Sequence, residues 1–298
     1  MSTNTVPDQQ IVSALRHKVG DVVVTAVADG YIPLGADAVP NASQTDLDPY
    51  YEHAMIAPKD FKTNVNCYVL DFPDRRVLID AGGYQFSTKT MGRVPDVLTQ
   101  IGVEPDSVDV LVMTHLHPDH AGGTYLDDGS ARFPNARLIL NEREIAFWRD
   151  DSQANIDREG DKGDFKIAHA LLDAYADRTT AFSEESEVVP GMTSVPLYGH
   201  TPGHTGYHLK SKGEELLVWA DIVHMPAMQL GNPDFYIKLD VTPEEAVATR
   251  KRTLEWVADE KLTICGMHLP FPGFGHLRRS AAKGIKYEFV PLPYEYDV

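Results

Sequence analysis

Cysteine is scarce in this chain, since Cys67 and Cys265 are the only two among 298 residues. Two cysteines cannot form the disulfide framework on which small secreted domains depend, so stability has to come from a packed core. Hydrophobic residues make up 43% of the sequence, which is enough for such a core. This composition is typical of a reducing compartment, and we expect a cytoplasmic location.

Basic residues are also in short supply. The chain has 27 lysine and arginine residues against 44 aspartate and glutamate residues, which gives a formal net charge of −17. Nucleic acids and anionic membranes both attract basic surfaces, so we expect neither as a partner. Solubility is the simplest explanation for the excess of acidic residues.

Long apolar runs are missing as well. No stretch approaches the length of a membrane span, and residues 1–20 lack the basic start and apolar centre of a secretory signal. The sequence also shows no low-complexity linker, short repeat or change of composition that would mark a domain boundary. We therefore expect residues 1–298 to form a single domain.

Strand and helix patterns alternate along the chain. Apolar, β-branched runs predict strand segments at 21–30, 66–83 (with a hairpin turn at 71–76), 108–115, 136–141, 192–200, 204–221 and 261–268. Helical spacing predicts helices at 90–103, 141–150, 166–177 and 242–260. The last helix is expected to begin with a capping box of Thr242 and Glu245, and the polar segment 150–166 is expected to be a loop or lid. This mixture indicates an α/β or α+β layered fold.

The stretch VMTHLHPDHAGG, residues 112–123, holds three histidines and an aspartate within six residues. Neutral imidazole is the commonest metal ligand, and His115 and His117 are spaced so that both can face one ion. Asp119 and His120 could bind a second ion nearby. The glycine pair that follows allows the tight backbone that such a dense turn needs.

Three further candidate ligands stand where predicted strands end. His200 follows an apolar run, Asp221 ends the run LLVWAD, and His268 follows TICGM. A buried, unpaired carboxylate at Asp221 would be costly, whereas a carboxylate that bridges two cations would not be. Each residue alone could be an ordinary turn or capping residue. Together with the histidine cluster they indicate a metal site.

The motifs HLHPDH, GHTPGH, WAD and GMH resemble those of the metallo-β-lactamase-fold hydrolases over essentially the whole chain. The C-terminal stretches MHLPFPGFGHLR and KYEFVPLPYEY resemble a narrower branch, that of methyl parathion hydrolase and related lactonases. The resemblance implies a four-layer αββα sandwich, of class α/β (α+β), with a dinuclear centre at the mouth between its two sheets. The narrower resemblance also implies a homodimer.

The resemblance also implies a ligand set. One ion would bind His115, His117 and His200, the other would bind Asp119, His120 and His268, and Asp221 would bridge the two. Nitrogen and oxygen ligands without cysteine suit two Zn²⁺ ions, with Fe, Mn or Co as alternatives. Asp80 matches an acid that the family keeps beside the metals, and we expect it to orient a ligand imidazole. His204 is either a second such residue or a turn histidine.

The implied reaction is metal-assisted hydrolysis by a hydroxide that bridges two cations about 3.5–4 Å apart. We expect Asp119 to accept a hydrogen bond from this hydroxide and to aim it. His224, three residues beyond Asp221, should come close to the metals without binding them and could donate a hydrogen bond to a leaving oxygen. The alternative is a surface histidine without a catalytic part. The matching position in methyl parathion hydrolase resembles an apolar residue, so His224 favours lactones over phosphotriesters.

Aromatic and methionine side chains near the motifs predict an apolar substrate pocket. The candidates are Tyr84, Phe86, Phe147, Trp148, Met225, Met228, Phe271 and Phe274, of which at least half should belong to the core. Such a pocket suits a small, neutral, hydrophobic lactone or aryl ester. Organophosphate triesters, thioesters and β-lactams stay open as substrates, and so does a non-enzymatic metal-binding role.

Overall fold

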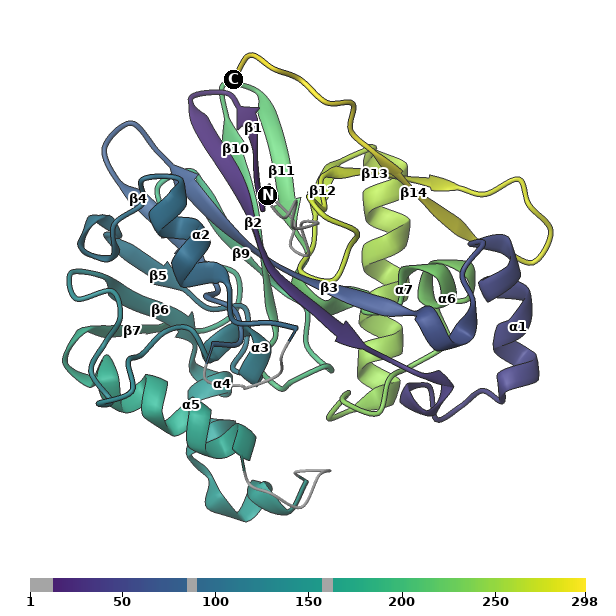
Figure 1. The fold of residues 1–298 in the computed structure, drawn as a ribbon, viewed down its shortest axis with the longest axis horizontal. Helices are drawn as coiled ribbons and strands as arrows, with labels where there is room; N and C mark the ends of the chain where they lie inside the picture. Colours follow the sequence, from purple (N-terminus) through teal and green to yellow (C-terminus); the bar gives the residue numbers. More distant parts are fainter. Residues whose placement is uncertain (1–12, 85–89, 157–162) are drawn as a thin grey trace, which may run out of the picture.

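The computed structural model of the protein describes residues 13–84, 90–156 and 163–298. Within these ranges two seven-stranded sheets form the centre of the molecule, and helices cover both outer faces (Figure 1). This arrangement confirms the αββα sandwich that the motifs implied. None of the helices in the described ranges combines the length and the apolar composition needed to cross a bilayer.

The first sheet has its strands in sequence order, from β1 to β7. Its strands are Ala14–Val19 (β1), Val22–Pro33 (β2), Lys62–Asp71 (β3), Arg76–Ile79 (β4), Val110–Val112 (β5), Arg137–Asn141 (β6) and Thr179–Phe182 (β7). Strands β1 to β4 pair antiparallel, whereas β4 to β7 pair parallel. The carboxyl ends of the parallel strands therefore meet at one edge, and the histidine stretch begins there, directly after β5.

The second sheet runs in the order β14-β13-β12-β11-β10-β9-β8. Its strands are Glu187–Val189 (β8), Met192–Pro196 (β9), Thr205–Ser211 (β10), Glu214–Val218 (β11), Thr263–Cys265 (β12), Gly275–Arg279 (β13) and Tyr287–Pro291 (β14). Strands β11 and β12 form a parallel pair, so the segments that follow them leave the sheet at the same edge. These are the segments that carry Asp221 and His268.

Helices occupy the connections between strands. They are Gln44–His53 (α1), Val94–Gln100 (α2), Pro118–Ala121 (α3), Glu142–Arg149 (α4), Gly163–Ala174 (α5), Pro226–Gly231 (α6) and Pro243–Glu260 (α7). Short 3-10 turns are Ala36–Ala38 (η1), Pro58–Asp60 (η2), Pro105–Ser107 (η3), Asp151–Ile156 (η4), Ala176–Arg178 (η5) and Ala220–Ile222 (η6). The predicted helices at 90–103, 141–150, 166–177 and 242–260 correspond to α2, α4, α5 and α7.

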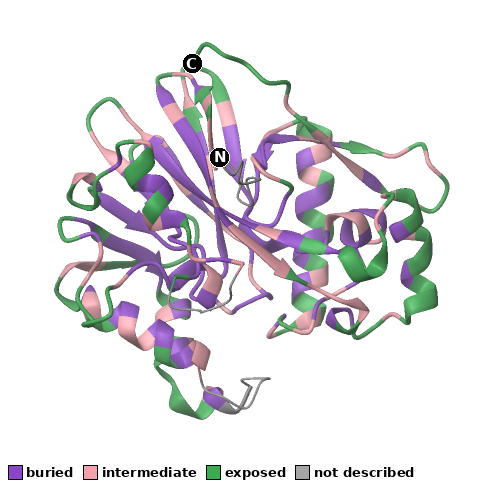
Figure 2. Ribbon diagram, viewed as in Figure 1, coloured by how far each residue is buried: buried purple, intermediate pink, exposed green. Residues whose placement is uncertain are grey.

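Three apolar layers hold the sandwich together. Buried side chains such as Val24, Leu70 and Tyr207 fill the space between the sheets. Helices α2 and α5 pack on the outer face of the first sheet, and α7 packs on that of the second through Leu254 and Val257. Figure 2 shows the central strands as the most buried part of the chain. Burial at roughly 25 cal/mol per Å² of apolar area makes these layers the main source of stability.

The predicted capping box at α7 is wrong. Thr242 is the N-cap residue, but its side chain makes no capping hydrogen bond. Its backbone N–H instead donates to the carbonyl oxygen of Gly199, which ties the start of α7 to the loop before His200. A capping box does form at α1, which the sequence patterns did not predict: Ser43 and Asp46 each accept from the backbone N–H of the other.

The segment 150–166 is not simply the loop or lid that its polarity predicts. Residues Asp151–Ile156 form η4, and α5 already begins at Gly163. Residues 157–162 of this segment lie outside the described ranges. Strand β1 is a further element that the sequence patterns did not predict.

Candidate functional site

The predicted ligands come together where strands of both sheets end. His115 follows β5, His200 lies between β9 and β10, Asp221 lies in η6, and His268 follows β12. His117 is the N-cap residue of α3, and Pro118 occupies the first turn, where its missing N–H and fixed φ are well tolerated. The turn is as tight as the glycine pair predicts, because a Cβ at Gly123 would lie 1.8 Å from the carbonyl oxygen of Ala81.

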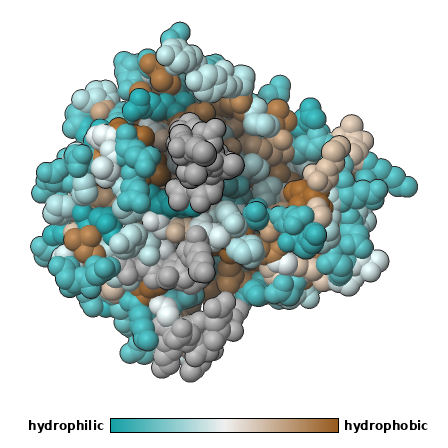
Figure 3. Space-filling model, in the orientation of Figure 1, coloured by the Kyte–Doolittle hydropathy of each residue, from teal (hydrophilic) through white to brown (hydrophobic). Residues whose placement is uncertain are grey.

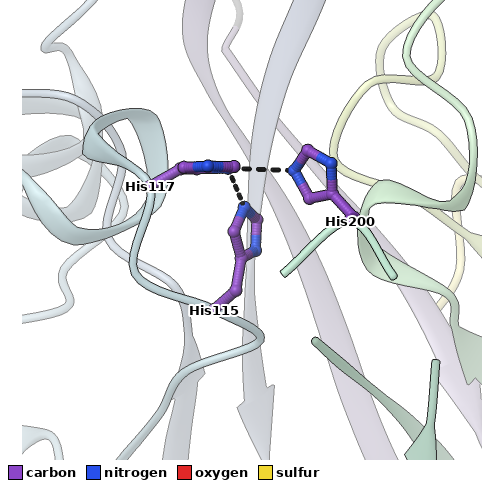
Figure 4. A group of neighbouring side chains, drawn as sticks. All are labelled: His115, His117 and His200. Atoms are coloured by element: carbon purple, nitrogen blue, oxygen red, sulfur yellow. Dashed lines mark hydrogen bonds between the residues drawn. The ribbon is translucent and has the colours of Figure 1, made fainter. Parts of the chain in front are cut away.

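Three imidazoles form the first group of the site (Figure 4). His117 Nδ1 lies 2.9 Å from His115 Nε2 and 2.9 Å from His200 Nε2. One ring nitrogen has a single proton or a single lone pair, so it cannot form good hydrogen bonds with both neighbours when they also lack protons. Three nitrogens that point to one place are the arrangement that binds a cation.

A single carboxylate oxygen lies at the centre of the site. Asp221 Oδ2 is within 3.6 Å of the Nε2 atoms of five histidines: 3.6 Å from His115, 3.2 Å from His120, 3.5 Å from His200, 3.0 Å from His224 and 3.0 Å from His268. Asp119 adds a second carboxylate, whose Oδ2 lies 3.5 Å from Nε2 of both His120 and His268. Asp119, His120 and His268 form a second group with the spacing of metal ligands.

Hydrogen bonds behind the rings leave the inward nitrogens free to bind a cation. In three histidines the Nδ1 atom, on the side of the ring away from the centre, lies close to an oxygen. His120 Nδ1 lies 2.7 Å from Asp80 Oδ2, and His200 Nδ1 lies 2.8 Å from Asp240 Oδ1. His268 Nδ1 lies 2.7 Å from the carbonyl oxygen of Asn64. Because these oxygens only accept, each Nδ1 must carry the proton, and each Nε2 then offers a lone pair when the ring is neutral.

The buried polar atoms themselves fit bound cations. Among the described residues, neither His120 Nε2 nor Asp221 Oδ1 has a hydrogen-bond partner. A buried polar atom left without a partner is costly, and a metal ion satisfies it. The imidazole and carboxylate donors therefore fit two divalent metal ions.

The two groups differ in charge. Burial lowers the pKa of His115, His117 and His200, that of His117 to about 4, so the first group is neutral at pH 7. Burial also disfavours charge at His120, but the carboxylates of Asp221, Asp119 and Asp80 outweigh it and raise the pKa of His120 well above its usual value. A cation in the second group would therefore replace protons.

Both carboxylates of the centre are ionised. Burial raises the pKa of a carboxyl group, but His120 and His268 lower the pKa of Asp119 to about 2. The same two histidines, with His224, hold the pKa of Asp221 well below its usual range despite its burial. Asp119 is the more accessible of the two, with 13% of its side chain exposed, so it faces the open side of the centre.

The two expected orienting residues contact different parts of the centre. Asp80 accepts from Thr114 N at 2.8 Å and from Thr114 Oγ1 at 2.7 Å, besides its contact with His120. His204 donates from Nδ1 to the carbonyl oxygen of Leu197 at 2.7 Å and accepts from the backbone N–H of Asp221 at 3.0 Å. His204 thus holds the backbone of Asp221 rather than a ligand imidazole.

His224 is not the surface histidine that the sequence left as an alternative, because it is 2% exposed. Its ring stacks on that of His268, with centroids 4.8 Å apart. With His200 and Asp221 it forms a third set of atoms at metal-ligand spacing, so it lies closer to ligand positions than its predicted place outside them. Neither ring nitrogen has a hydrogen-bond partner among the described residues, although Nε2 lies 3.0 Å from Asp221 Oδ2.

Several of the predicted pocket residues that the structure describes lie in the core. Trp148, Met225, Met228 and Phe274 are buried in three different core clusters, and none is more than 2% exposed. Phe147 and Phe271 are partly buried against the core, and Tyr84 is 43% exposed beneath the guanidinium of Arg132. Trp148 does touch the centre, with its ring 5.6 Å from that of His117. Phe86 lies outside the described residues.

A groove of about 330 Å³ adjoins His268 at a place the sequence did not indicate. Its walls come from the end of α1, the start of β3, α6 and β14, with Phe61, Leu230 and Phe289 among its apolar side chains. Hydrophobic atoms gather at the surface over α6, between β14 and α1 (Figure 3).

Glu144 is a buried residue of the site that sequence reasoning missed. Its carboxylate accepts from Leu116 N (3.0 Å) and Trp148 Nε1 (2.6 Å) through Oε1, and from Thr201 Oγ1 (2.7 Å) and Gly203 N (3.0 Å) through Oε2. It therefore ties the loop of His115 and His117 to the loop of His200. In the sequence Glu144 is one acid of a charged helix, and nothing there distinguishes it from its exposed neighbours.

Two non-glycine residues at the site have strained backbone conformations. Asp80 and Ala220, the residue before Asp221, have φ angles of 58° and 51°, in the left-handed region that non-glycine residues rarely adopt. Such conformations persist where surrounding structure fixes them, and they cluster at functional sites.

Residues 61–281 match the family model described as Metallo-beta-lactamase superfamily. The N-acyl homoserine lactonase AiiA of Bacillus thuringiensis subsp. kurstaki is 24% identical over 256 residues, which cover 79% of this chain and 90% of the lactonase.

Solved structures give the same comparison in three dimensions. The hydrolase AbOPH, of the beta lactamase superfamily, superposes with a TM-score of 0.89 at 30% identity, covering 96% of this chain and 100% of AbOPH. AidC, a dizinc quorum-quenching lactonase solved with a product, superposes with a TM-score of 0.86 at 23% identity, covering 95% of this chain and 98% of AidC.

Proposed function

Because the chain belongs to the metallo-beta-lactamase superfamily, we propose that it is a metal-dependent hydrolase of neutral, hydrophobic lactones that uses two divalent metal ions. The observation that carries the proposal is the position of Asp221 Oδ2 among the inward nitrogens of His115, His120, His200, His224 and His268. A carboxylate so placed could contact both cations, and they would offset the cost of its burial.

The two groups of side chains divide the ions between them. His115, His117 and His200 would hold one ion, Asp119, His120 and His268 the other, with Asp221 between. A set of nitrogen and oxygen donors without cysteine favours zinc. When bound, two such ions supply Lewis acidity and lower the pKa of water, so that water can attack an ester at neutral pH.

Two residues of the chain would handle protons. Asp119 is ionised and faces the open side, so it can accept a hydrogen bond from the attacking water and orient it. Burial lowers the pKa of His224, so its ring is neutral at pH 7 and carries one N–H. That N–H can donate to the alkoxide or phenoxide oxygen as the ester bond breaks.

The preference for lactones rests on the relatives and on His224. The names of AiiA and AidC describe both as lactonases. A lactone keeps its leaving oxygen tethered beside the new carboxylate, within reach of one nearby hydrogen-bond donor. The same site would accept aryl esters, which have a similar neutral carbonyl and leaving oxygen.

Hydrolysis of a panel of chromogenic substrates tests the proposal. The panel holds an aryl lactone, a thioester, a β-lactam and an organophosphate triester, and kcat/KM is measured for each. We expect the lactone to give the highest value, and chelator to abolish all activity until divalent metal is restored. A higher kcat/KM on the triester would reverse the substrate assignment, and activity that survives complete removal of metal would place the chemistry elsewhere.

A further inference from the structure

Asp240 lies behind His200, just before α7. Its carboxylate is buried, and Oδ1 accepts from His200 Nδ1 at 2.8 Å while Oδ2 accepts from Ile237 N at 3.1 Å. Asp80 has the corresponding place behind His120, because its Oδ2 lies 2.7 Å from His120 Nδ1. Each of the two ligand groups thus contains one histidine that is backed by a buried carboxylate.

Arg250, on α7, fixes Asp240 from the other side. Its guanidinium is buried, and Nη2 lies 3.6 Å from Asp240 Oδ2. Nε donates to the carbonyl oxygen of Ile222 at 2.7 Å, directly after Asp221, and Nη1 donates to that of Phe235 at 2.8 Å. A buried guanidinium is costly unless its donors are satisfied, so this residue has one fixed position. It neutralises Asp240 and holds the segment that carries Asp221.

The backbone around Asp240 also holds the histidine. Val241 N donates to the carbonyl oxygen of His200, and Thr242 N to that of Gly199, each at 2.9 Å. The ring and the backbone of His200 are therefore both held by residues 240–242. With the ring fixed in this way, Nε2 points at His117 Nδ1, 2.9 Å away.

We propose that Asp240, held in place by Arg250, is a positioning residue that acts on the first metal ion alone, as the counterpart of Asp80 for the second. A carboxylate that accepts from a ligand imidazole fixes its tautomer and strengthens its donor nitrogen. Loss of such a partner typically lowers metal affinity about 10–100-fold. The inference rests on the ligand groups of the proposed function and not on the identity of the substrate.

Metal titration of the stripped protein tests the pairing. Co²⁺ is added against a competing chromophoric chelator, and the two dissociation constants are compared among the wild type, Asp240→Asn and Asp80→Asn. Two single-site variants show which absorption spectrum belongs to which site. His268→Ala keeps the first group of ligands, and His117→Ala keeps the second. We expect Asp240→Asn to weaken the first site about 10–100-fold and to leave the second unchanged, and Asp80→Asn to do the reverse.

A merely structural role would give another pattern. Equal weakening of both sites by Asp240→Asn, or no weakening, would overturn the proposal. If Asp240→Asn fails to fold by circular dichroism, imidazole ¹⁵N spectra of the metal-loaded wild type decide instead: His200 should be protonated on Nδ1, and protonation on Nε2 would contradict the pairing. A wild type that binds one ion would contradict the ligand groups, whereas a wild type without lactonase activity would leave this test intact.

Discussion

Glu144 shows at the residue scale how one buried carboxylate can assemble the first metal group. Four donors converge on its two oxygens, three from two loops and one, Trp148 Nε1, from its own helix α4. Burial raises the pKa of Glu144 despite these hydrogen bonds. Two of these donors lie beside ligands, Leu116 between His115 and His117, and Thr201 next to His200. Glu144 therefore helps to hold the two loops together, beside the backbone hydrogen bond from Thr205 N to the carbonyl oxygen of Thr114.

Replacing Glu144 by Gln should destabilise the metal-free protein. The amide NH₂ of Gln cannot accept, so the two donors that face it lose their partner, at about 1–3 kcal/mol each. The free energy of unfolding, measured by urea denaturation, should fall by that order. Glu142→Gln, at an exposed position in the same helix, is the matched control. Equal stability of the two variants would show that Glu144 does not hold the loops.

His204 should make stability depend on pH. Burial lowers its pKa from 6.5 to about 4 in the folded protein, where its unprotonated Nε2 accepts a hydrogen bond from Asp221 N. Between these values the unfolded chain binds the proton and the folded protein does not. Stability is therefore complete above about pH 6.5 and is lost as the pH falls toward 4, by up to about 3 kcal/mol from this residue.

Urea denaturation of the metal-free protein between pH 4 and 7 measures this effect. Burial also lowers the pKa of His115, His117 and His200, whereas the pKa values of His120 and His268 are raised and act with the opposite sign. The comparison is therefore between the wild type and His204→Gln. The variant should lose less stability over the same pH range. Parallel curves for the two proteins would mean that His204 is not held neutral.

His224 should affect the choice of substrate. His224→Leu removes a donor to the leaving oxygen, and we expect kcat/KM for an aryl lactone to fall on the order of 10²-fold, with hydrolysis of an organophosphate triester spared or improved. His208→Leu, which removes a histidine of β10 that pairs with Glu215 of β11, is the control. An unchanged lactone rate in His224→Leu would exclude the residue from the reaction.

At the scale of elements, the sequence patterns predicted most accurately the polar residues that follow buried strands. The runs that form β5, β11 and β12 are short and mostly apolar. The polar residues His115, Asp221 and His268 that follow them are therefore easy to recognise as candidate ligands. Helix α1 was missed because it is polar and contains Pro49. Capping at α7 was mispredicted because the backbone N–H of Thr242 donates to the carbonyl oxygen of Gly199, whereas its side chain makes no capping hydrogen bond.

The partners of the ligands were missed for another reason. Glu144, Asp240 and Arg250 act on backbone groups and rings that are far away in the sequence. Arg250, for instance, donates to Ile222, 28 residues earlier. Only the folded chain brings such groups together. The sequence alone does not distinguish a charged residue that is buried from one that is exposed. Most of the aromatic residues near the motifs that the structure describes belong to the cores or pack against them.

The two helix starts provide a prediction at this scale. Ser43 caps α1 through its side chain, whereas Thr242 makes no side-chain cap at α7, and both residues are exposed. Ser43→Ala should therefore lower the free energy of unfolding by about 1 kcal/mol, and Thr242→Ala by clearly less. Thermal or urea denaturation of the two variants under the same conditions compares them. A larger loss in Thr242→Ala would contradict the capping assignment.

At the scale of the whole molecule, the site exists only where the two sheets meet. The first sheet and its helices supply His115, His117, Asp119 and His120, and the second supplies His200, Asp221 and His268. Neither sheet alone provides both Asp221 and the two groups of proposed ligands around it. Bound metal would therefore link the two sheets, and its binding energy would add to the stability of the sandwich.

The number of metal ions per chain tests the central claim most directly. Purified wild-type protein, saturated with Zn²⁺ and freed of excess metal, is analysed by mass spectrometry of its elements beside Asp119→Ala and His268→Ala. We expect about two ions per chain in the wild type and about one in each variant, because both substitutions remove a ligand of the second group only. One ion per chain in the wild type, unchanged in both variants, would contradict a dinuclear centre.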